Sequence, residues 1–278
     1  MSQIKIVTDS TAFLEKDVLE RYDIEVVPLH VNFTGESILD GTIDSAAFFD
    51  KLKKSSTIPS TSQPSPGDFA RIFKESIEEG KEIIAILISS GISGTVESAK
   101  TAAKMVDPSR ISIIDSLSTS GGLAFLVSAA AQAAEEGKAR EKIVALLEDL
   151  KNKLQVLFVP ESLHYLKKGG RIGGAQALLG TILQIKPILF FSEGKIEVYE
   201  KVRTMKKALH RLADELPPAS AGLQVAILTA EAEESTRMLK ELVRKRLPDQ
   251  PIKIYELSPV IATHVGPVVG LVFIKHTN

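Results

Sequence analysis

The sequence predicts an α/β protein with two domains, an N-terminal domain built on a parallel sheet and a C-terminal α+β domain. In the first half, nearly continuous apolar runs of strand length alternate with amphipathic helical stretches, which is the pattern of βαβ units. In the second half, two strand-like runs flank residues 192–194, Ser-Glu-Gly, and predict a β-hairpin with antiparallel pairing. The length of 278 residues fits about two domains.

The N-terminal domain is expected to span residues 1–153. Its apolar runs lack polar alternation, as strands do when both faces of a parallel sheet are covered. These strands are expected at residues 4–7, 82–88 and 110–114. Helical periodicity places helices at residues 67–79, 95–106, 121–136 and 140–150.

The C-terminal domain is expected to span residues 154–278. Strands are predicted at residues 154–159, 187–191, 195–202, 224–228, 252–257 and 268–274. Helices are predicted at residues 161–168, 204–216 and 233–246. Residues 169–174 read as a glycine-rich loop, and His264 is placed in a loop before the last strand.

Composition excludes several classes of function. Lys and Arg number 34 against 35 Asp and Glu, so there is no basic excess for a nucleic-acid partner. The absence of cysteine removes disulfides, thiolate metal sites and cysteine nucleophiles. The five histidines share no metal-ligand spacing and no nucleotide fingerprint occurs, so neither a metal nor another cofactor is expected. Without a signal peptide or a membrane-length apolar run, we expect a cytoplasmic protein with no stable membrane insertion.

Two loops place hydroxyl groups just before predicted helices, where free backbone N–H groups favour an anion. Residues 61–66 (TSQPSP) are the first, with simple helix capping by Ser65 as the alternative. Residues 89–95 (SSGISGT) are the second, where glycines on both sides of Ser93 let a ligand approach the backbone. This loop follows a buried strand, at the sheet edge where open parallel sheets bind ligands, although a tight turn with a cap would look the same.

Two further segments carry candidate cationic or polar groups. Arg171 lies among four glycines and could bind a carboxylate or phosphate through two parallel hydrogen bonds. The alternative is a flexible linker with a solvated arginine. His264 precedes Gly266-Pro267, which indicates a fixed backbone, although a lone histidine is more often structural.

Five segments, taken together and in order, resemble the DegV family of bacterial lipid-binding proteins. They are residues 7–11, 61–65, 88–95 followed by Ser98-Ala99, 166–172 and 185–189. The resemblance implies a fatty acid, such as palmitate or oleate, buried between the two domains. It also implies that the protein is the fatty-acid-binding subunit of a kinase, a separate chain that converts the bound carboxylate into an acyl phosphate.

The resemblance also implies which residues hold the head group. The carboxylate ligands would be Thr61 and Ser93, accompanied by three more residues: Ser62, Gly94 and His264. Arg171 and Arg203 would be the basic residues that face the head group, the phosphate or the kinase. The family motif His-Thr-Gly-Pro-Gly reads His-Val-Gly-Pro-Val here, so a hydroxyl is lost at Val265 and a glycine at Val268.

The acyl chain requires an apolar slot, because each buried CH₂ group contributes about 0.8 kcal/mol. A sixteen-carbon chain would gain about 10 kcal/mol before entropic losses. Candidate lining residues lie on both sides of Lys186, with ordinary core packing as the alternative for each. They are Leu178, Leu179, Ile182, Leu183, Ile188 and Phe190.

A stand-alone hydrolase is the competing interpretation. It would use Ser93 as nucleophile, His264 as base and Asp9 as the carboxylate behind the histidine. This requires hydrogen-bond contact between Ser93 and His264. A DNA-binding regulator is a second alternative, which the formal net charge of -1 disfavours.

Overall fold

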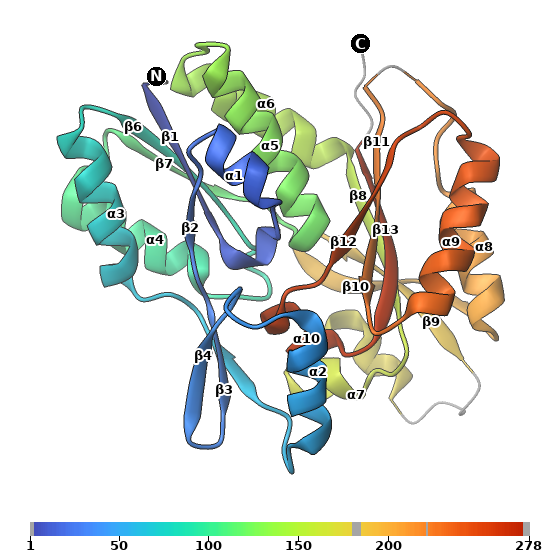
Figure 1. The fold of residues 1–278 in the computed structure, drawn as a ribbon. Coiled ribbons are helices and arrows are strands. Elements are labelled where there is room, and N and C mark those ends of the chain that lie inside the picture. Colours follow the sequence, from blue (N-terminus) through green and yellow to red (C-terminus); the bar gives the residue numbers. More distant parts are fainter. Residues whose placement is uncertain (1–2, 180–184, 221, 275–278) are drawn as a thin grey trace.

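The computed structural model describes residues 3–179, 185–220 and 222–274, and in this part of the chain the strands form three sheets (Figure 1). The first sheet has four parallel strands in the order β2-β1-β6-β7. They are β1 (Ile4–Asp9), β2 (Glu25–Val27), β6 (Glu82–Leu87) and β7 (Ile111–Asp115). Because β1 has β2 on one side and β6 on the other, the carboxyl ends of β1 and β6 form a crevice where such sheets bind ligands.

Helices cover both faces of this sheet, which explains its uninterrupted apolar strands. Ile83, Ala85 and Leu87 of β6 share a buried cluster with α3 (Pro66–Glu78) and α4 (Thr95–Val106). Ile84 and Ile86 point to the other face and join a cluster with α5 (Ser120–Glu135). The helix α6 (Arg140–Lys153) packs beside α5.

The second sheet has six strands in the order β10-β9-β8-β13-β11-β12, with all pairs antiparallel except β11–β12. Its strands are β8 (Leu154–Pro160), β9 (Lys186–Ser192), β10 (Lys195–Val202), β11 (Gln224–Ala230), β12 (Ile252–Glu256) and β13 (Val268–Ile274). The helices α8 (Met205–Asp214) and α9 (Glu233–Arg246) cover one face (Figure 1). The other face is turned toward α5.

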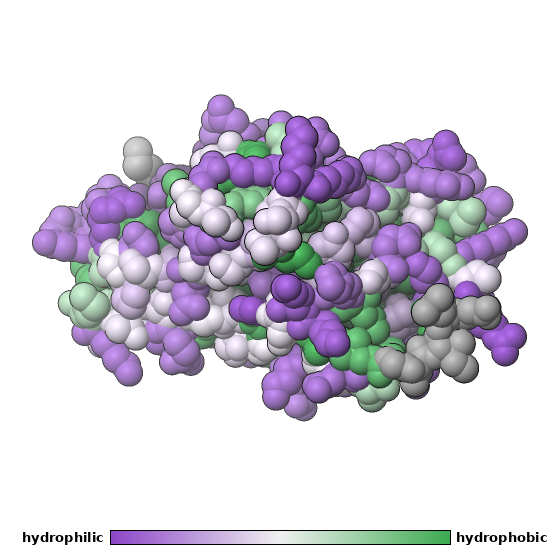
Figure 2. Space-filling view, turned by 90° about the horizontal axis from the view of Figure 1, so that it is seen from below, coloured by the Kyte–Doolittle hydropathy of each residue, from purple (hydrophilic) through white to green (hydrophobic). Residues whose placement is uncertain are grey.

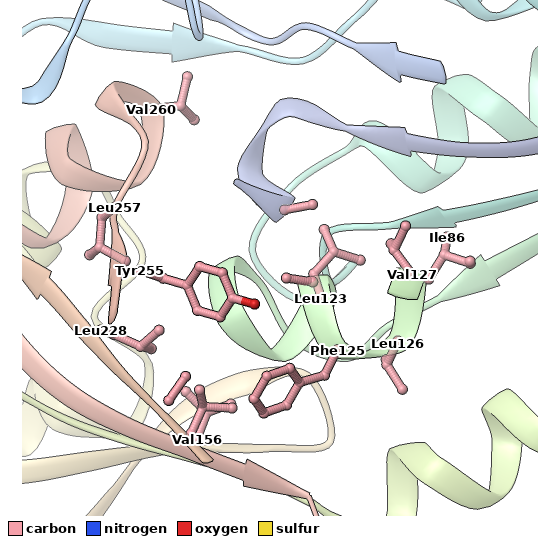
Figure 3. Close-up of a cluster of buried hydrophobic side chains, with 14 of the residues drawn as sticks. Ile86, Leu123, Phe125, Leu126, Val127, Val156, Leu228, Tyr255, Leu257 and Val260 are labelled. Carbon is pink, nitrogen blue, oxygen red and sulfur yellow. The ribbon is translucent and has the colours of Figure 1, made fainter. Parts of the chain in front are cut away.

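The helix α5 lies between the two large sheets and joins them into one core. Figure 3 shows Leu123 and Phe125 of α5 facing Val156, Leu228 and Tyr255 of the second sheet. The same cluster includes residues of β1 and β6. The two halves of the chain therefore share a hydrophobic core.

Shorter elements connect the two halves. A three-stranded antiparallel sheet, in the order β4-β3-β5, contains β3 (His30–Phe33), β4 (Glu36–Leu39) and β5 (Ser60–Ser62). The remaining helices are α1 (Lys16–Arg21), α2 (Ser45–Lys54), α7 (His164–Lys168) and α10 (Pro259–Val265), with 3₁₀ turns η1 (Ser10–Ala12) and η2 (Gly173–Leu178). Of these, α10 contacts β3 and β5, although it follows them by about two hundred residues in the chain.

The predicted fold class is confirmed, with a parallel N-terminal sheet and a sheet-rich C-terminal region. Two local predictions are corrected. His264 lies in helix α10 and not in a loop, because Ser258 caps that helix and Pro259 occupies its first turn. Only residues 164–168 of the predicted helix at 161–168 are α-helical, and residues 173–178 form a 3₁₀ turn. The division at 153/154 remains a proposal; α6 ends at Lys153 and β8 begins at the next residue.

The surface is mostly hydrophilic on the face at the bottom of Figure 1. Figure 2 shows this face from below, with an apolar area among the hydrophilic residues. Among the helices that the structure describes, none is both long enough and apolar enough to span a membrane.

Candidate ligand-binding site

A cavity lies between the loops of the first sheet and the inner face of the second sheet. Its unfilled space is about 860 Å³, including the part open to solvent. Apolar side chains from both halves form most of its wall: Leu29, Ile88, Ile92, Val156, Phe158, Leu166, Phe191, Ile196, Leu228, Leu257, Val260, Ile261, Val265 and Val268. A mostly apolar cleft with few polar groups is the usual form of a small-molecule site.

The polar residues of the wall are few. They are Thr61, Gln63, Ser93, Thr119, Ser120, Arg171 and His264. Four of these, Thr61, Ser93, Arg171 and His264, are residues that the sequence singled out. The fold brings them to one cavity from β5, the loop after β6, the loop after α7, and α10.

Thr61 and His264 are in direct contact, although they belong to different halves of the chain. Thr61 Oγ1 and His264 Nε2 are 2.7 Å apart and share a hydrogen bond. Thr61 reaches this position because β5 pairs with β3, where Thr61 lies opposite Val31. The contact ties the small sheet to α10 beside the cavity.

His264 is held as a neutral imidazole. Burial, followed by the positive charge of Arg171, lowers the pKa of His264 to about 4. Within the described part of the chain, its Nδ1 atom is buried and has no hydrogen-bond partner. Gly169 lies against this atom, and a Cβ at residue 169 would be 2.2 Å from it.

Arg171 and Ser93 complete the polar group. Arg171 donates from Nε to the carbonyl of Ile92 (3.2 Å) and from Nη1 to the carbonyl of Gly169 (2.5 Å). These two bonds fix the guanidinium between the loop that contains Ser93 and Gly169, which packs against His264. Ser93 Oγ lies 2.9 Å from Thr95 Oγ1 at the start of α4.

Two buried aspartates support the loops that carry this group. Asp9, at the end of β1, accepts a hydrogen bond from Ile88 N (2.6 Å), next to the loop that contains Ser93. Asp40 accepts from Ser10 Oγ (2.7 Å) and from Val260 N (3.2 Å) at the start of α10. Burial raises the pKa of both carboxyl groups to about 6.

Several predicted head-group residues lie elsewhere. The side chain of Ser62 is exposed and accepts a hydrogen bond from Asn32, because alternate residues of β5 point to opposite sides. Gly94 packs against Gln63, outside the cavity wall. Arg203 is exposed between β10 and α8 and does not line the cavity.

The predicted acyl-chain residues are also displaced. Ile188 and Phe190 belong to the cluster under α8, on the outer face of the second sheet, so they do not line this cavity. Their neighbour Phe191 does. Leu178 is buried and Leu179 packs against the core, but neither lines the cavity, and Ile182 and Leu183 lie outside the described residues.

Thr119 and Ser120 are cavity residues that sequence reasoning missed. They follow β7 at the same edge of the sheet as the Ser93 loop follows β6. The run Ser116-Leu117-Ser118-Thr119-Ser120, directly after a buried strand, was the available signal.

The geometry does not form the hydrolase triad considered above. His264 contacts Thr61 through Nε2, and no carboxylate contacts its other ring nitrogen among the described residues. Asp9 bonds instead to Thr11 and to the backbone of Ile88. The described residues also contain no cluster of His, Asp and Glu suited to a metal ion.

Comparison with known proteins identifies the family. The family model described as "Uncharacterised protein, DegV family" matches residues 3–276. A DegV domain-containing protein of Clostridium acetobutylicum is 36% identical over 284 residues, covering 99% of both chains. A solved structure described as fatty acid binding of a DegV family protein from Thermus thermophilus has a TM-score of 0.90 and 36% identity, covering 99% of this chain and 100% of that one. A stearic acid-binding protein from Eubacterium ventriosum has a TM-score of 0.85 and 27% identity, covering 98% of each chain. This chain therefore belongs to the DegV family.

Proposed function

We propose that this protein binds one long-chain fatty acid, such as palmitate, oleate or stearate, and presents its carboxylate to a separate kinase. The observation that carries the proposal is the cavity itself: a mainly apolar wall with Thr61, Ser93, Arg171 and His264 as its head-group residues. Relatives of the same fold that are described as fatty-acid-binding proteins support this assignment.

The carboxylate is bound by donors and by one cation. A buried carboxylate needs such partners, since its desolvation is otherwise uncompensated. Thr61 and Ser93 supply hydroxyl donors, and Arg171 supplies the positive charge. Because Arg171 already donates to two backbone carbonyls, its guanidinium is positioned before the ligand arrives.

His264 acts as a positioning residue for Thr61. A hydroxyl has one proton, so Thr61 can donate to the carboxylate only if His264 donates to Thr61. This requires a proton on Nε2, the ring atom 2.7 Å from Thr61 Oγ1. With its pKa lowered to about 4, His264 is neutral near pH 7, and we assign its single proton to Nε2, because Nδ1 has no acceptor among the described residues.

The acyl chain occupies the apolar part of the cavity. Val156, Phe158, Phe191 and Leu228 supply this wall from the second sheet. Burial of a sixteen-carbon chain contributes about 10 kcal/mol before entropic losses, so the tail dominates affinity and the polar residues set orientation.

The kinase role rests on the family resemblance of the sequence. In that reaction a carboxylate oxygen attacks the γ-phosphorus of ATP, the bond to the β-phosphate oxygen breaks, and ADP leaves with the electron pair. The products are an acyl phosphate and ADP. We propose that Arg171 stabilises the negative charge that develops on the transferred group.

The test uses delipidated full-length protein in two assays. Titration with palmitate, oleate and stearate measures binding, and ATP consumption with a DegV-partner kinase measures phosphorylation. We expect saturation near one acid per chain and acyl-phosphate formation only when kinase, carrier and acid are all present. Turnover of an ester or phosphate ester by the protein alone would favour the hydrolase instead.

A further inference from the structure

The cavity has a second polar location, at the start of α5. Thr119 and Ser120 line the cavity and are only 6% and 1% exposed. Neither Thr119 Oγ1 nor Ser120 Oγ has a hydrogen-bond partner in the described part of the protein. Buried hydroxyls without partners are uncommon, because each loses its hydrogen bonds to water and gains nothing in exchange.

This location packs against the apolar wall of the cavity. The next two residues show what the first turn of α5 packs against: a Cβ at Gly121 would touch Leu228, and one at Gly122 would touch Val156. Leu228 and Val156 belong to the apolar wall. No hydrogen bond among the described residues links Thr119 or Ser120 to Thr61, Ser93, Arg171 or His264.

The chemistry of this location favours a neutral oxygen over a second carboxylate. The helix α5 has 16 residues and no side-chain cap at its N-terminal end, so its first turn favours an acceptor oxygen of a ligand. The charged group of the cavity wall, Arg171, is held against Ile92 and Gly169 with the other polar residues. Two hydroxyls without a cation match an alcohol group, which can accept from one hydroxyl and donate to the other.

We propose that the cavity accommodates a fatty acid with a hydroxyl group on its chain, and that Thr119 and Ser120 bind this hydroxyl. The inference rests on the proposed function, since the carboxylate of the same molecule would lie at Thr61 and Arg171. An unsubstituted acid leaves both protein hydroxyls unpaired. A hydroxylated acid whose oxygen reaches the start of α5 satisfies them.

The test compares stearate with a set of stearates, each hydroxylated at a different chain carbon. Dissociation constants are measured by titration calorimetry on delipidated wild type and on the Thr119→Val/Ser120→Ala double variant. Ser118→Ala is the matched control: Ser118 is buried in the same loop and donates to the Thr119 carbonyl, but it does not line the cavity. Stearate affinity and circular dichroism report whether each variant folds.

For wild type we expect one positional isomer to bind at least as tightly as stearate. In the double variant, its affinity relative to stearate falls about tenfold, because the ligand hydroxyl is then buried without a partner. The control keeps the wild-type ratio. If every isomer binds wild type more weakly than stearate, or if the double variant leaves the ratio unchanged, the hydroxyl site is refuted while fatty-acid binding stands. If no acid binds at all, the proposed function fails as well.

Discussion

Replacing Thr61 by valine removes one oxygen from the polar end of the cavity and keeps the shape of the side chain. The β-branched valine suits β5, so the pairing of residue 61 with Val31 should persist. The lost atom is Oγ1, which is 2.7 Å from His264 Nε2. Because His264 Nδ1 already lacks a partner among the described residues, the variant leaves both ring nitrogens unpaired.

Two magnitudes follow from this geometry. An unpaired buried polar group costs about 1–3 kcal/mol, which should appear as a lower unfolding free energy of the empty protein. A lost hydrogen bond to a charged carboxylate costs about 1.5–3 kcal/mol. The dissociation constant for stearate should therefore rise about 10- to 150-fold, while the acyl chain still holds the ligand.

The assay is calorimetric titration of delipidated protein, with thermal unfolding measured in parallel. Ser62→Ala is the control, since Ser62 is the next residue of β5 and points away from the cavity. We expect its dissociation constant to match wild type. An unchanged constant for Thr61→Val would refute the contact with the carboxylate, and an equal loss in both variants would attribute the effect to β5 itself.

Three further predictions test other parts of the site. Arg171→Ala should reduce kinase-dependent acyl-phosphate formation more than stearate binding. Arg171→Lys should retain only part of the acyl-phosphate formation, because an ammonium group does not reproduce the two parallel hydrogen bonds of the planar guanidinium. Equal losses in both assays would mean that Arg171 only binds the carboxylate. Gly169→Ala should weaken binding about tenfold, because its Cβ would lie 2.2 Å from His264 Nδ1 and displace the ring from Thr61; wild-type affinity would contradict this. Burial raises the pKa of Asp40 from 3.8 to about 6, so the folded state binds the carboxyl proton of Asp40 more tightly than the unfolded state does. Protonated Asp40 therefore contributes stability that is fully present below about pH 4. That contribution, about 3 kcal/mol, is lost as the pH rises through about 6. Denaturant titrations from about pH 4 to about pH 7 should therefore show the unfolding free energy of wild type falling by this much relative to that of Asp40→Asn. A difference in unfolding free energy that stays constant with pH would refute this prediction.

Much of the fold could be predicted because its elements carry local signals. Residues 95–106, 233–246 and 268–274 match α4, α9 and β13 at both ends. Their amphipathic or continuous apolar patterns begin and end at charged or turn residues. The small sheet was missed because β4 (ESIL) and β5 (STS) are short and largely polar, and are defined by their pairing with β3.

The polar residues of the cavity were easier to predict than its apolar wall. Thr61 belongs to β5, at the start of a hydroxyl-rich segment, and Ser93 and Arg171 lie in loops; the hydroxyl, glycine and arginine content of these segments exceeds what a turn requires. Residues 188–191 are apolar on both faces, because one face of β9 packs under α8 and the other faces the cavity. Alternation shows that Ile188 and Phe190 share a face, but only the tertiary structure shows that Leu189 and Phe191 are on the inner one.

The contact that holds the start of α10 could not be predicted from a local sequence pattern. Ser258-Pro259 is a recognisable helix start, yet the contact of Asp40 with Val260 joins residues 220 positions apart. Asp40 itself follows a short exposed strand and carries no motif. Its role depends on the tertiary structure, in which Ser10 and the start of α10 share its carboxylate.

In the proposed function, the cavity holds one fatty acid by its carboxylate. The most direct measurement is native mass spectrometry of the protein purified from a bacterial host, followed by denaturation and identification of any released lipid. We predict a mass increase that matches a single long-chain fatty acid, lost on delipidation and restored by palmitate, oleate or stearate. Protein that carries no lipid and takes up none of these acids would contradict the account.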